Sequence, residues 1–422
     1  MSETSPYRIF KFGGASVKDA AAVRNVASIL SRYSNEKLVV VVSAMGKTTN
    51  ALEVIHQCRF HGKDHKAELL ELKHFHLEIA NGLSLSEAEL QPLFHQFEKF
   101  EEVLASPCSR QYDMEYDQVV CYGELFSTAL IHSFLVKEKF SSQWLDARQI
   151  VRTDNRFRDA RVNWQHSAAN TIMLQMALDK KNIVIVQGFI GSTSVGLSTT
   201  LGREGSDFTA AIMAYLLDAR DVTIWKDVPG MLNADPKWFK NTVKLDQISF
   251  REAIELAYYG ASVIHPKTIK PLQNKNIPLH IKSFIHPEEK GSIIQENMDY
   301  DHLVPSYIFK ANQVLVSITP KDFSFVVEDN LKEIFDLLAQ QGIRISLMEN
   351  SAISFSICTD KDPYKLEHLF EALKENYQVR YNEGLTLITI RHWDDKTLQM
   401  LTEGKEVLLE QRSRQTVRLV VR

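Results

Sequence analysis

The heptapeptide at residues 11–17, Lys-Phe-Gly-Gly-Ala-Ser-Val, joins a lysine to two adjacent glycines and therefore suits phosphate binding. An apolar run directly before it predicts a strand, and apolar periodicity over residues 17–30 predicts a helix. Because glycine lacks a Cβ atom, the backbone at Gly13 and Gly14 can approach a ligand, and N–H groups at a helix start attract anions. Lys11 adds a cation beside them. The heptapeptide alone fits an ordinary turn with a solvated lysine equally well.

Two further motifs carry charged side chains of the kind that bind a small charged substrate. The loop at residues 202–207, Gly-Arg-Glu-Gly-Ser-Asp, precedes an apolar-periodic helix, and Ser206 is the predicted N-cap of that helix. Glu124 lies near the first turn of a helix predicted at residues 122–130, among apolar neighbours. Its carboxylate either complements the helix dipole or, if it is buried beside a cleft, holds a cation.

Two other patterns do not support the sites that they first suggest. The tripeptide Gly-Lys-Thr at residues 46–48 follows a strand-like run, but a P-loop needs another glycine five positions before its second one, where Val41 stands. Six of the 14 histidines lie between residues 56 and 95, in a region rich in Leu, Glu and Lys. We expect long helices there, with a break near residues 81–82, and we expect the histidines to be solvated rather than to bind a metal.

The elements that must position these motifs form an alternating series of strands and helices. Short apolar runs predict strands at residues 7–10, 38–42, 183–186, 222–225 and 277–281. Helical patterns, including one at residues 253–260, predict an open α/β sheet that is mostly parallel and flanked by helices. Such sheets bind ligands at the carboxyl ends of their strands, and the polar motifs follow strands. Their convergence favours a single ligand site.

The pattern changes near residue 300. Beyond it the sequence predicts strand, helix, strand, strand, helix and strand at residues 314–318, 331–341, 343–347, 353–358, 364–376 and 378–381. The remainder predicts only a strand, a helix and a strand, at residues 385–390, 396–409 and 416–421. Such a half unit cannot cover its own sheet, so we expect it to complete a sheet with the preceding unit or with another chain. The expected domains are residues 1–300, 301–383 and 384–422.

Composition excludes several classes of partner and compartment. The 422 residues are 44% hydrophobic and 24% charged, and the formal net charge of −4 gives no electrostatic reason to expect nucleic acid or an anionic membrane as a partner. The most apolar run is far shorter than the roughly 20 residues that span a bilayer. The N-terminus lacks the pattern of a signal peptide, and the four cysteines show no paired spacing. We therefore expect a cytoplasmic protein with reduced thiols.

Together these motifs resemble those of the aspartate kinases of the amino-acid kinase superfamily. The resemblance covers nearly the whole chain, and its motifs are KFGGASV at 11–17, VVSAMGKTTNAL at 41–52, GELFSTAL at 123–130, QGFIGS at 187–192, TTLGREGSDFTAA at 199–211, KDVPGMLNADP at 226–236 and YGASVIHPKTI at 259–269. It implies an amino-acid kinase fold at residues 1–300, followed by two α+β ACT-like regulatory modules, the second of them truncated. The implied reaction is the ATP-dependent phosphorylation of the β-carboxylate of L-aspartate to 4-phospho-L-aspartate, the first step of lysine, methionine and threonine biosynthesis.

The resemblance also implies roles for individual residues. Glu124 would hold the α-ammonium group of aspartate, and Arg203 its α-carboxylate. Because the β-carboxylate is already ionised at pH 7, the reaction needs alignment and cations rather than a general base. The implied catalytic residues are Lys11 and Asp207, and the implied substrate pocket comprises Ser43, Thr49, Glu124, Phe189, Arg203 and Ser206. The implied ATP site comprises Lys11, Gly13, Gly14, Lys226, Asp227, Leu232, Lys237 and Ser262, and Mg²⁺ is expected to arrive with ATP.

Two departures from the family pattern lie in the catalytic region. Glu204 stands where the family often has a second glycine, and its carboxylate is expected beside Arg203 or in solvent. Lys226 replaces a common threonine, whereas Ser262 occupies the place of a lysine that contacts the nucleotide in many members. We hypothesise that this lysine has moved from the helix side to the strand end.

A third departure concerns regulation. Lysine-sensitive members usually carry acidic residues around the positions of Ser346 and Ala352, and here only Glu349 is near. An effector's α-groups would bind main-chain atoms near Asn350 and Ser351. We therefore expect weak inhibition by lysine, with threonine fitting at least as well, and a homodimer formed through residues 313–422.

Two alternatives remain open on the sequence. One is an amino-acid kinase that acts on glutamate, acetylglutamate or a nucleotide, although such enzymes lack the combination of Glu124, the 203–207 loop and ACT modules. The other is a ligand-sensing protein with an inactive kinase domain, against which the presence of Lys11, Asp207 and Arg203 argues.

Overall fold

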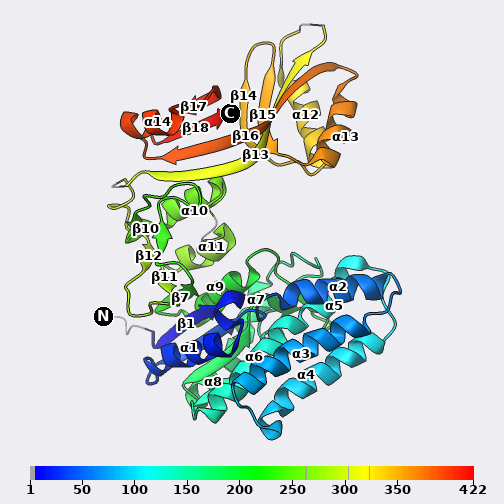
Figure 1. Cartoon of the computed structure of the whole chain (residues 1–422), viewed down its shortest axis with the longest axis vertical. Coiled ribbons are helices and arrows are strands. Elements are labelled where there is room, and N and C mark those ends of the chain that lie inside the picture. Colours follow the sequence, from blue (N-terminus) through cyan, green and yellow to red (C-terminus); the bar gives the residue numbers. More distant parts are fainter. Residues whose placement is uncertain (1–4, 262–263, 303, 323) are drawn as a thin grey trace. The chain divides into compact units, whose positions relative to one another are not determined.

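The computed structural model describes residues 5–261, 264–302, 304–322 and 324–422, which form two compact units (Figure 1). The first unit contains the described residues within 1–231, 244–254 and 263–298. The second contains those within 232–243, 255–262 and 299–422. Two short internal segments of the expected first domain, residues 1–300, and its last two residues thus belong to the second unit.

An eight-stranded sheet forms the centre of the first unit. In spatial order its strands are β10 (Gln247–Ser249), β12 (Ser292–Gln295), β11 (Leu279–Ser283), β7 (Asp221–Lys226), β1 (Tyr7–Phe12), β2 (Lys37–Val42), β4 (Ile183–Gln187) and β3 (Ser142–Trp144). All neighbouring strands run parallel except β11 and β12. The predicted open, mostly parallel sheet is therefore confirmed.

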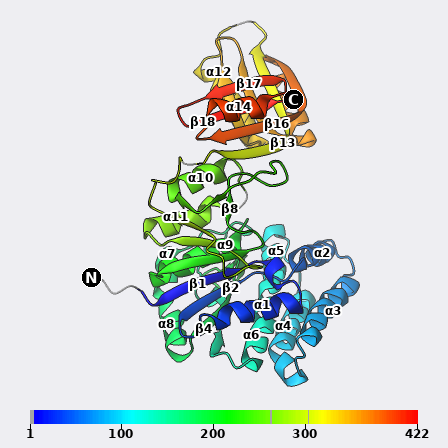
Figure 2. The same ribbon diagram turned by 60° about the vertical axis from the view of Figure 1, so that its left-hand side comes forward.

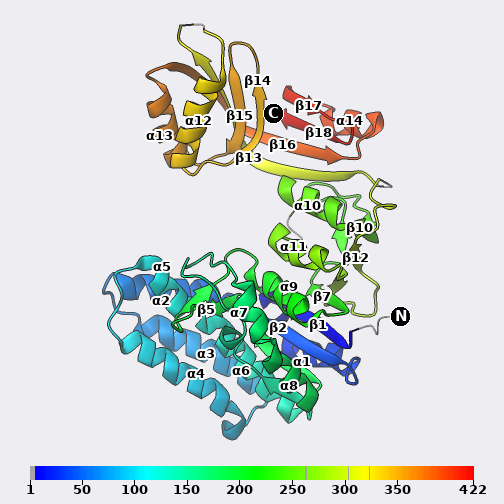
Figure 3. The same ribbon diagram turned by 180° about the vertical axis from the view of Figure 1, so that it is seen from behind.

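Helices cover both faces of the sheet, which explains why the central strands carry apolar side chains on both faces. The five residues from Leu38 to Val42 in β2 are all 0% exposed. Helix α9 (Gly205–Leu217) packs against β1, β2 and β7, whereas α6 (Tyr122–Lys137) packs against β2, β3 and β4 (Figures 1 and 3). A parallel sheet that is covered on both faces requires this kind of continuous apolar strand.

Helices α5 (Tyr112–Val120) and α6 form one helical run, Tyr112–Lys137, that is long and apolar enough to cross a membrane by length and composition. In this structure 89% of its most apolar window is buried inside the protein. Its partners include the sheet and the long helix α4 (Glu87–Ala105). Burial in the core accounts for its apolar composition.

The predicted region of long helices contains α2 (Thr48–Phe60), α3 (Lys66–Gly82) and α4 (Figure 2). The end of α3 confirms the predicted break near residues 81–82. A further break, which the sequence pattern did not predict, separates α2 from α3. Gly62 adopts a φ of +66° there, a conformation that glycine reaches without steric cost and that commonly ends a helix.

The prediction that the histidines of this region are solvated is wrong for two of them. His56 and His76 are 1% and 0% exposed. His76 Nδ1 lies 2.8 Å from the carbonyl oxygen of Leu72, and its ring packs edge-on against Phe97 and Phe126. Within the described residues, no group of three or more His, Cys, Asp and Glu side chains could hold a metal. Both buried histidines are core residues.

Shorter elements complete the region up to residue 298. They are η1 (Gly14–Val17), α1 (Ala20–Ser31), η2 (Ala147–Gln149), α7 (Trp164–Ala169), α8 (Thr171–Lys180), β5 (Ile190–Ser192), β6 (Ser198–Thr200), β8 (Met231–Leu232), β9 (Lys244–Leu245), α10 (Phe250–Tyr259) and α11 (Pro266–Asn274). The helix predicted from residue 17 begins later, because the carboxylate of Asp19 accepts a hydrogen bond from Ala22 N at 2.8 Å and caps α1.

The second unit contains a six-stranded antiparallel sheet in the order β14-β15-β13-β16-β18-β17. Its elements are β13 (Ser306–Pro320), α12 (Glu328–Gln340), β14 (Ile345–Asn350), β15 (Phe355–Asp360), α13 (Pro363–Leu373), β16 (Tyr377–Arg391), α14 (Asp395–Thr402), β17 (Val407–Arg412) and β18 (Thr416–Val421). The half unit thus completes a sheet with the preceding unit of the same chain, which was one of the two predicted outcomes.

Two details of the C-terminal prediction are wrong. The strands predicted at residues 378–381 and 385–390 form one continuous strand, β16, which pairs with β13 along most of its length. The helix predicted to reach residue 409 ends at Thr402, because Gly404 adopts a φ of +72° and the chain then pairs with β18 as β17. Leu408 and Leu409, which fitted a helical period, instead pack against a sheet-face core that includes Leu315.

Candidate active site

A cavity of about 580 Å³ opens where β1, β2, β4 and β7 end. These strands are neighbours in the sheet and run parallel, so the segments that follow them converge at one edge. The predicted site residues that line this cavity are Lys11, Gly14, Ser43, Thr49, Glu124, Phe189, Arg203, Ser206, Asp207 and Lys226. The structure therefore brings these predicted residues together around one cavity, and their binding of a ligand stays a prediction.

Three charged residues form a buried ion-pair cluster at the strand ends. Nζ of Lys11, on β1, lies 2.6 Å from Oδ1 of Asp207, and Nζ of Lys226, on β7, lies 3.3 Å from Oδ2. Asp207 is 2% exposed in the first turn of α9. Burial raises the pKa of its carboxyl, but the positive charges of Lys11 and Lys226 outweigh that effect and hold the pKa below its usual value. The carboxylate therefore stays ionised and orients both ammonium groups.

The two glycines of the phosphate-loop motif have different surroundings. A Cβ atom on Gly14 would lie 2.7 Å from the carbonyl oxygen of Ala44, and Gly46 N donates a hydrogen bond to Gly14 O at 3.1 Å. Gly14 is thus required by the close approach of the loop that follows β2. A Cβ atom on Gly13 would lie 3.4 Å from Lys11 Nζ, so Gly13 lies beside the ammonium group, although it does not line the cavity.

Glu124 presents one unpartnered carboxylate oxygen to the cavity. The residue is 3% exposed on α6, and its Oε1 accepts a hydrogen bond from Ala44 N at 3.2 Å. Its Oε2 is buried without a hydrogen-bond partner among the described residues. Burial raises the pKa of Glu124 to about 8. A positively charged ligand group at this position would restore the solvation that the carboxylate has lost.

The loop that precedes α9 differs from the predicted capping pattern. The N-cap of α9 is Glu204, with φ of +54°, and Ser206 lies inside the first turn, so the predicted N-cap role of Ser206 is wrong. The reason is close packing: a Cβ atom on Gly205 would lie 2.6 Å from the ring of Phe189, and one on Gly188 would lie 2.5 Å from Ser206 Cβ. The helix start is thereby pressed against the segment that follows β4.

Arg203 and Glu204 carry opposite charges but lie in different environments. Arg203 is exposed and forms no ion pair within the described part of the chain. Glu204 lines the cavity, and its Oε2 is buried without a hydrogen-bond partner among the described residues. Burial raises the pKa of its carboxyl. The solvent position that was one expectation for Glu204 is therefore wrong.

The structure adds cavity residues that sequence reasoning missed. The main ones are Ala44, Tyr116, Arg158 and Thr200. Asp117, which is fully buried, organises two of them, because its Oδ2 accepts hydrogen bonds from Arg158 N at 3.0 Å and Thr200 N at 2.8 Å. The guanidinium of Arg158 lies 4.4 Å from the ring centroid of Tyr116. The local sequence around Asp117 gives no signal for this role, because Arg158 and Thr200 lie far away in the sequence.

Of the predicted ATP-site residues that the structure describes, Gly13, Asp227, Leu232 and Lys237 do not line the cavity. Asp227 is exposed directly after β7. Leu232 and Lys237 belong to the second unit, and Ser262 lies outside the described residues. Their assignment to the nucleotide stays a prediction, as does the exchange of roles between Lys226 and Ser262.

The arrangement suits a small amino acid that carries an additional anionic group. The Lys11–Asp207–Lys226 cluster presents two ammonium groups at one place on the wall, and Glu124 presents an unpartnered carboxylate oxygen at another. Arg203 supplies an exposed guanidinium at the mouth. Cations placed at the carboxyl ends of parallel strands stabilise the charge of a transferring phosphoryl group.

Comparison with known proteins identifies similar chains. The model of the amino acid kinase family matches residues 6–283. The lysine-sensitive aspartokinase 3 of Escherichia coli (strain K12) is 30% identical over 392 residues, which cover 90% of this chain and 86% of that protein. The crystal structure of E. coli aspartokinase III in complex with lysine and aspartate matches with a TM-score of 0.82 at 28% identity and covers 99% of this chain and 96% of the other. The structure of E. coli aspartokinase III with aspartate and ADP matches with a TM-score of 0.80 at 28% identity, covering 98% and 96%.

Proposed function

Because this chain belongs to the amino acid kinase family, and within it to the aspartokinases, we propose that it transfers the terminal phosphoryl group of ATP to the β-carboxylate of L-aspartate. The products are 4-phospho-L-aspartate and ADP. This reaction opens the biosynthesis of lysine, methionine and threonine. The observation that carries the proposal is the cavity at the strand ends, where an unpartnered buried carboxylate and a cluster of cations face the same space.

Each charged group of aspartate has a complementary group in the cavity. The α-ammonium binds Oε2 of Glu124, the buried oxygen that lacks a partner within the described residues. The α-carboxylate binds Arg203, whose exposed guanidinium is free of ion pairs in the described chain. Ser43, Thr49, Phe189 and Ser206 line the same cavity and limit its size. Held at two points, the substrate directs its β-carboxylate toward the nucleotide.

The β-carboxylate attacks without prior proton removal, because it is ionised at neutral pH. Catalysis therefore consists of alignment and of stabilising the charge on the transferring group. Lys11 is directed by its 2.6 Å contact with Asp207 and lies next to Gly13. We assign the binding of the phosphoryl oxygens to Lys11 and to the amides of Gly13 and Gly14. Asp207 is assigned the role of orienting Lys11 and Lys226.

Mg²⁺ enters this scheme together with ATP. The described residues contain no group of three or more His, Cys, Asp and Glu that could hold a metal, so the ligands of the cation must include phosphate oxygens and water. When bound, the cation neutralises charge on the phosphates. Asp227, Leu232, Lys237 and Ser262 are proposed to bind the rest of the nucleotide.

The proposal extends to the assembly, its effector and its location. A homodimer through residues 313–422 would cover β14 and β17, which are the edges of the six-stranded sheet. An amino-acid effector would bind near Asn350 and Ser351 by main-chain groups. Four free cysteines, of which Cys121 and Cys358 are buried, agree with a cytoplasmic location.

The test is an acyl-phosphate trapping assay with hydroxylamine. Purified protein, ATP and Mg²⁺ should give hydroxamate with L-aspartate and little with L-glutamate, because glutamate is one methylene longer and a pocket fixed by Glu124 and Arg203 misplaces its γ-carboxylate. N-acetylglutamate lacks the ammonium group and should give none. Equal turnover of glutamate would contradict the assignment, and an absence of turnover with every acid would favour an amino-acid sensor with an inactive kinase domain.

A further inference from the structure

Glu204 adopts a backbone conformation that a glutamate rarely adopts. Its φ and ψ are +54° and +30°, in the left-handed region, where a residue with a Cβ atom is strained. No side-chain hydrogen bond from Glu204 caps α9, although it is the N-cap residue. A negative side chain at this position is therefore not explained by capping of the helix.

The carboxylate of Glu204 is instead directed to the cavity. It lines the cavity, and its Oε2 is buried without a hydrogen-bond partner in the described part of the chain. Its neighbour in sequence, Arg203, forms no ion pair with it. An ionised oxygen that is removed from water without a partner is costly, so a bound cation is the expected partner in the working enzyme.

Two carboxylates now present unpartnered buried oxygens to one cavity, Glu124 and Glu204. Aspartate brings only one ammonium group, and Glu124, bonded to Ala44 N, lies on the wall that contains Ser43 and Thr49. Glu204 is the N-cap of α9, and Asp207 lies in the first turn of the same helix. Lys11 and Lys226, which pair with Asp207, form with it the cluster assigned to the phosphates. Glu204 therefore belongs to the nucleotide side of the cavity.

The remaining cation of the reaction is the divalent ion that accompanies ATP. We propose that Glu204 binds this ion, directly or through one coordinated water, and so fixes the metal–nucleotide complex beside Lys11. The inference rests on the proposed function. Mg²⁺ typically takes one or two carboxylates together with phosphate oxygens and water. Asp207 is not free for this task, because both of its oxygens are within ion-pair distance of a lysine.

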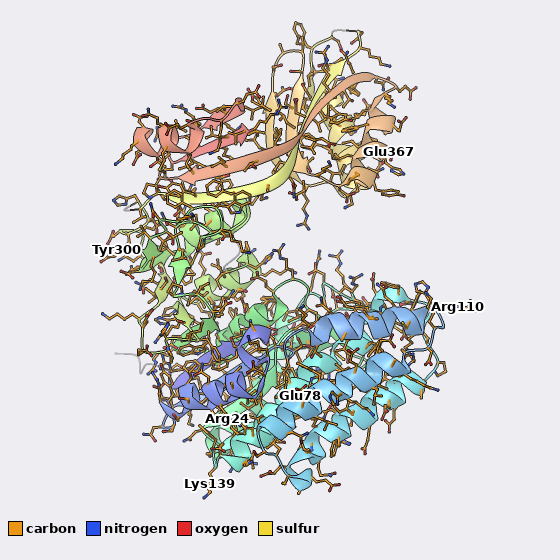
Figure 4. All side chains as sticks on the ribbon, viewed as in Figure 1. Arg24, Glu78, Arg110, Lys139, Tyr300 and Glu367 are labelled. Carbon is orange, nitrogen blue, oxygen red and sulfur yellow. The ribbon has the colours of Figure 1, made fainter. Side chains whose placement is uncertain are left out.

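The test measures metal binding rather than turnover. Free Mn²⁺ is followed by electron paramagnetic resonance while it is titrated into the full-length protein with saturating ADP, for the wild type and Glu204→Gln. We expect the variant to bind Mn²⁺ at least roughly tenfold more weakly, the scale seen when a group that supports a metal site is lost. Binding of ADP in the presence of EDTA and binding of aspartate, both by calorimetry, should be unchanged. Glu78→Gln, an exposed glutamate on α3 that Figure 4 labels, is the matched control.

Glu204→Gly separates the carboxylate from the backbone strain. Glycine adopts the left-handed conformation without cost, so this variant should fold at least as well as the wild type, yet it should lose Mn²⁺ affinity to the same extent as Glu204→Gln. Unchanged Mn²⁺ binding in either variant would overturn the proposal. Weaker aspartate binding with normal Mn²⁺ binding would assign Glu204 to the substrate ammonium and would also overturn it. Because the titration contains no aspartate, these outcomes are independent of the hydroxamate assay.

Discussion

Nζ of Lys11, on the first strand, lies 2.6 Å from Oδ1 of Asp207, in the first turn of α9. The pair joins two segments that are far apart in the sequence, and Lys11 is only 8% exposed. With its direction fixed before the nucleotide arrives, the ammonium group needs little reorganisation to stabilise charge on a phosphoryl group.

Replacing Lys11 with Met should lower kcat by roughly 10²–10³, the effect of losing one preorganised stabiliser of developing charge. The KM for aspartate should change little, because Lys11 is assigned to the phosphates. Lys226 can still pair with Asp207 in the variant, so the fold should persist. Steady-state kinetics measure kcat and KM, and thermal melting of both proteins is the control for folding. A kcat within a factor of about three of the wild type would remove Lys11 from the phosphate role.

Arg203→Ala should mainly raise the KM for aspartate. A hydrogen bond to a charged group contributes about 1.5–3 kcal/mol, which corresponds to a roughly 10–100-fold change. Arg110, an exposed arginine that Figure 4 labels and that does not line the cavity, provides the control variant Arg110→Ala. If both variants had the same KM for aspartate, the α-carboxylate would have to bind elsewhere.

The pH dependence of aspartate use should report on Glu124. Its free carboxyl, with a pKa of about 8, must lose a proton before it can hold an ammonium group. We therefore expect kcat/KM for aspartate to rise from pH 6 through pH 8 and to level off only above about pH 9, whereas kcat should vary less, because the bound ammonium favours the ionised form. Glu124→Gln should have a low kcat/KM without this rise. A profile that is flat from pH 6 to pH 9 would contradict the assignment.

Stability should decrease in mild acid because of His76. Burial lowers its pKa from 6.5 to about 4, so the unfolded chain binds this proton more tightly than the folded protein. The free energy of unfolding therefore keeps its full value above pH 6.5 and decreases as the pH falls toward 4. The loss from His76 is about 2 kcal/mol at pH 5. His76→Phe keeps an aromatic ring against Phe97 and Phe126 and should lose less stability between pH 7.5 and pH 5 in urea unfolding. His74→Phe, at an exposed position on the same helix, should behave as the wild type does.

Lysine should inhibit only weakly, at concentrations well above micromolar. Nζ of Lys310 lies 3.4 Å from Ser346 Oγ, and Arg418 donates a hydrogen bond to the carbonyl oxygen of Ser346, so cations already occupy the region where an effector ammonium would need an anion. Ala352 offers no charge, and Glu349 is exposed. Titration of lysine and threonine into the hydroxamate assay measures the effect. Half-inhibition at micromolar lysine would show that an anion outside this set binds the effector.

Local patterns in the sequence were sufficient for the five central strands β1, β2, β4, β7 and β11, but they did not predict the outer strands β3, β10 and β12. The β-branched run in β2 and the glycine-rich segments that follow strands predicted a parallel sheet, because a strand that is buried on both faces is apolar along nearly its whole length. The same reasoning predicted that the segment holding Arg203 and Asp207 would meet Lys11. Patterns failed where a break or a pairing depends on distant residues: β17 fits a helical period, yet it becomes a strand because β18 offers an edge.

Only the tertiary structure decided what each charged side chain does in the site. The sequence placed Glu124 on a helix, but whether it faces a cavity with one oxygen unpartnered depends on Ala44, which a different strand delivers. Glu204 lies in the cavity because the packing of Gly205 against Phe189 fixes the helix start. Asp117 and Arg158 meet for the same kind of reason. Burial and partnership arise from contacts between distant segments, and a local sequence pattern does not contain them.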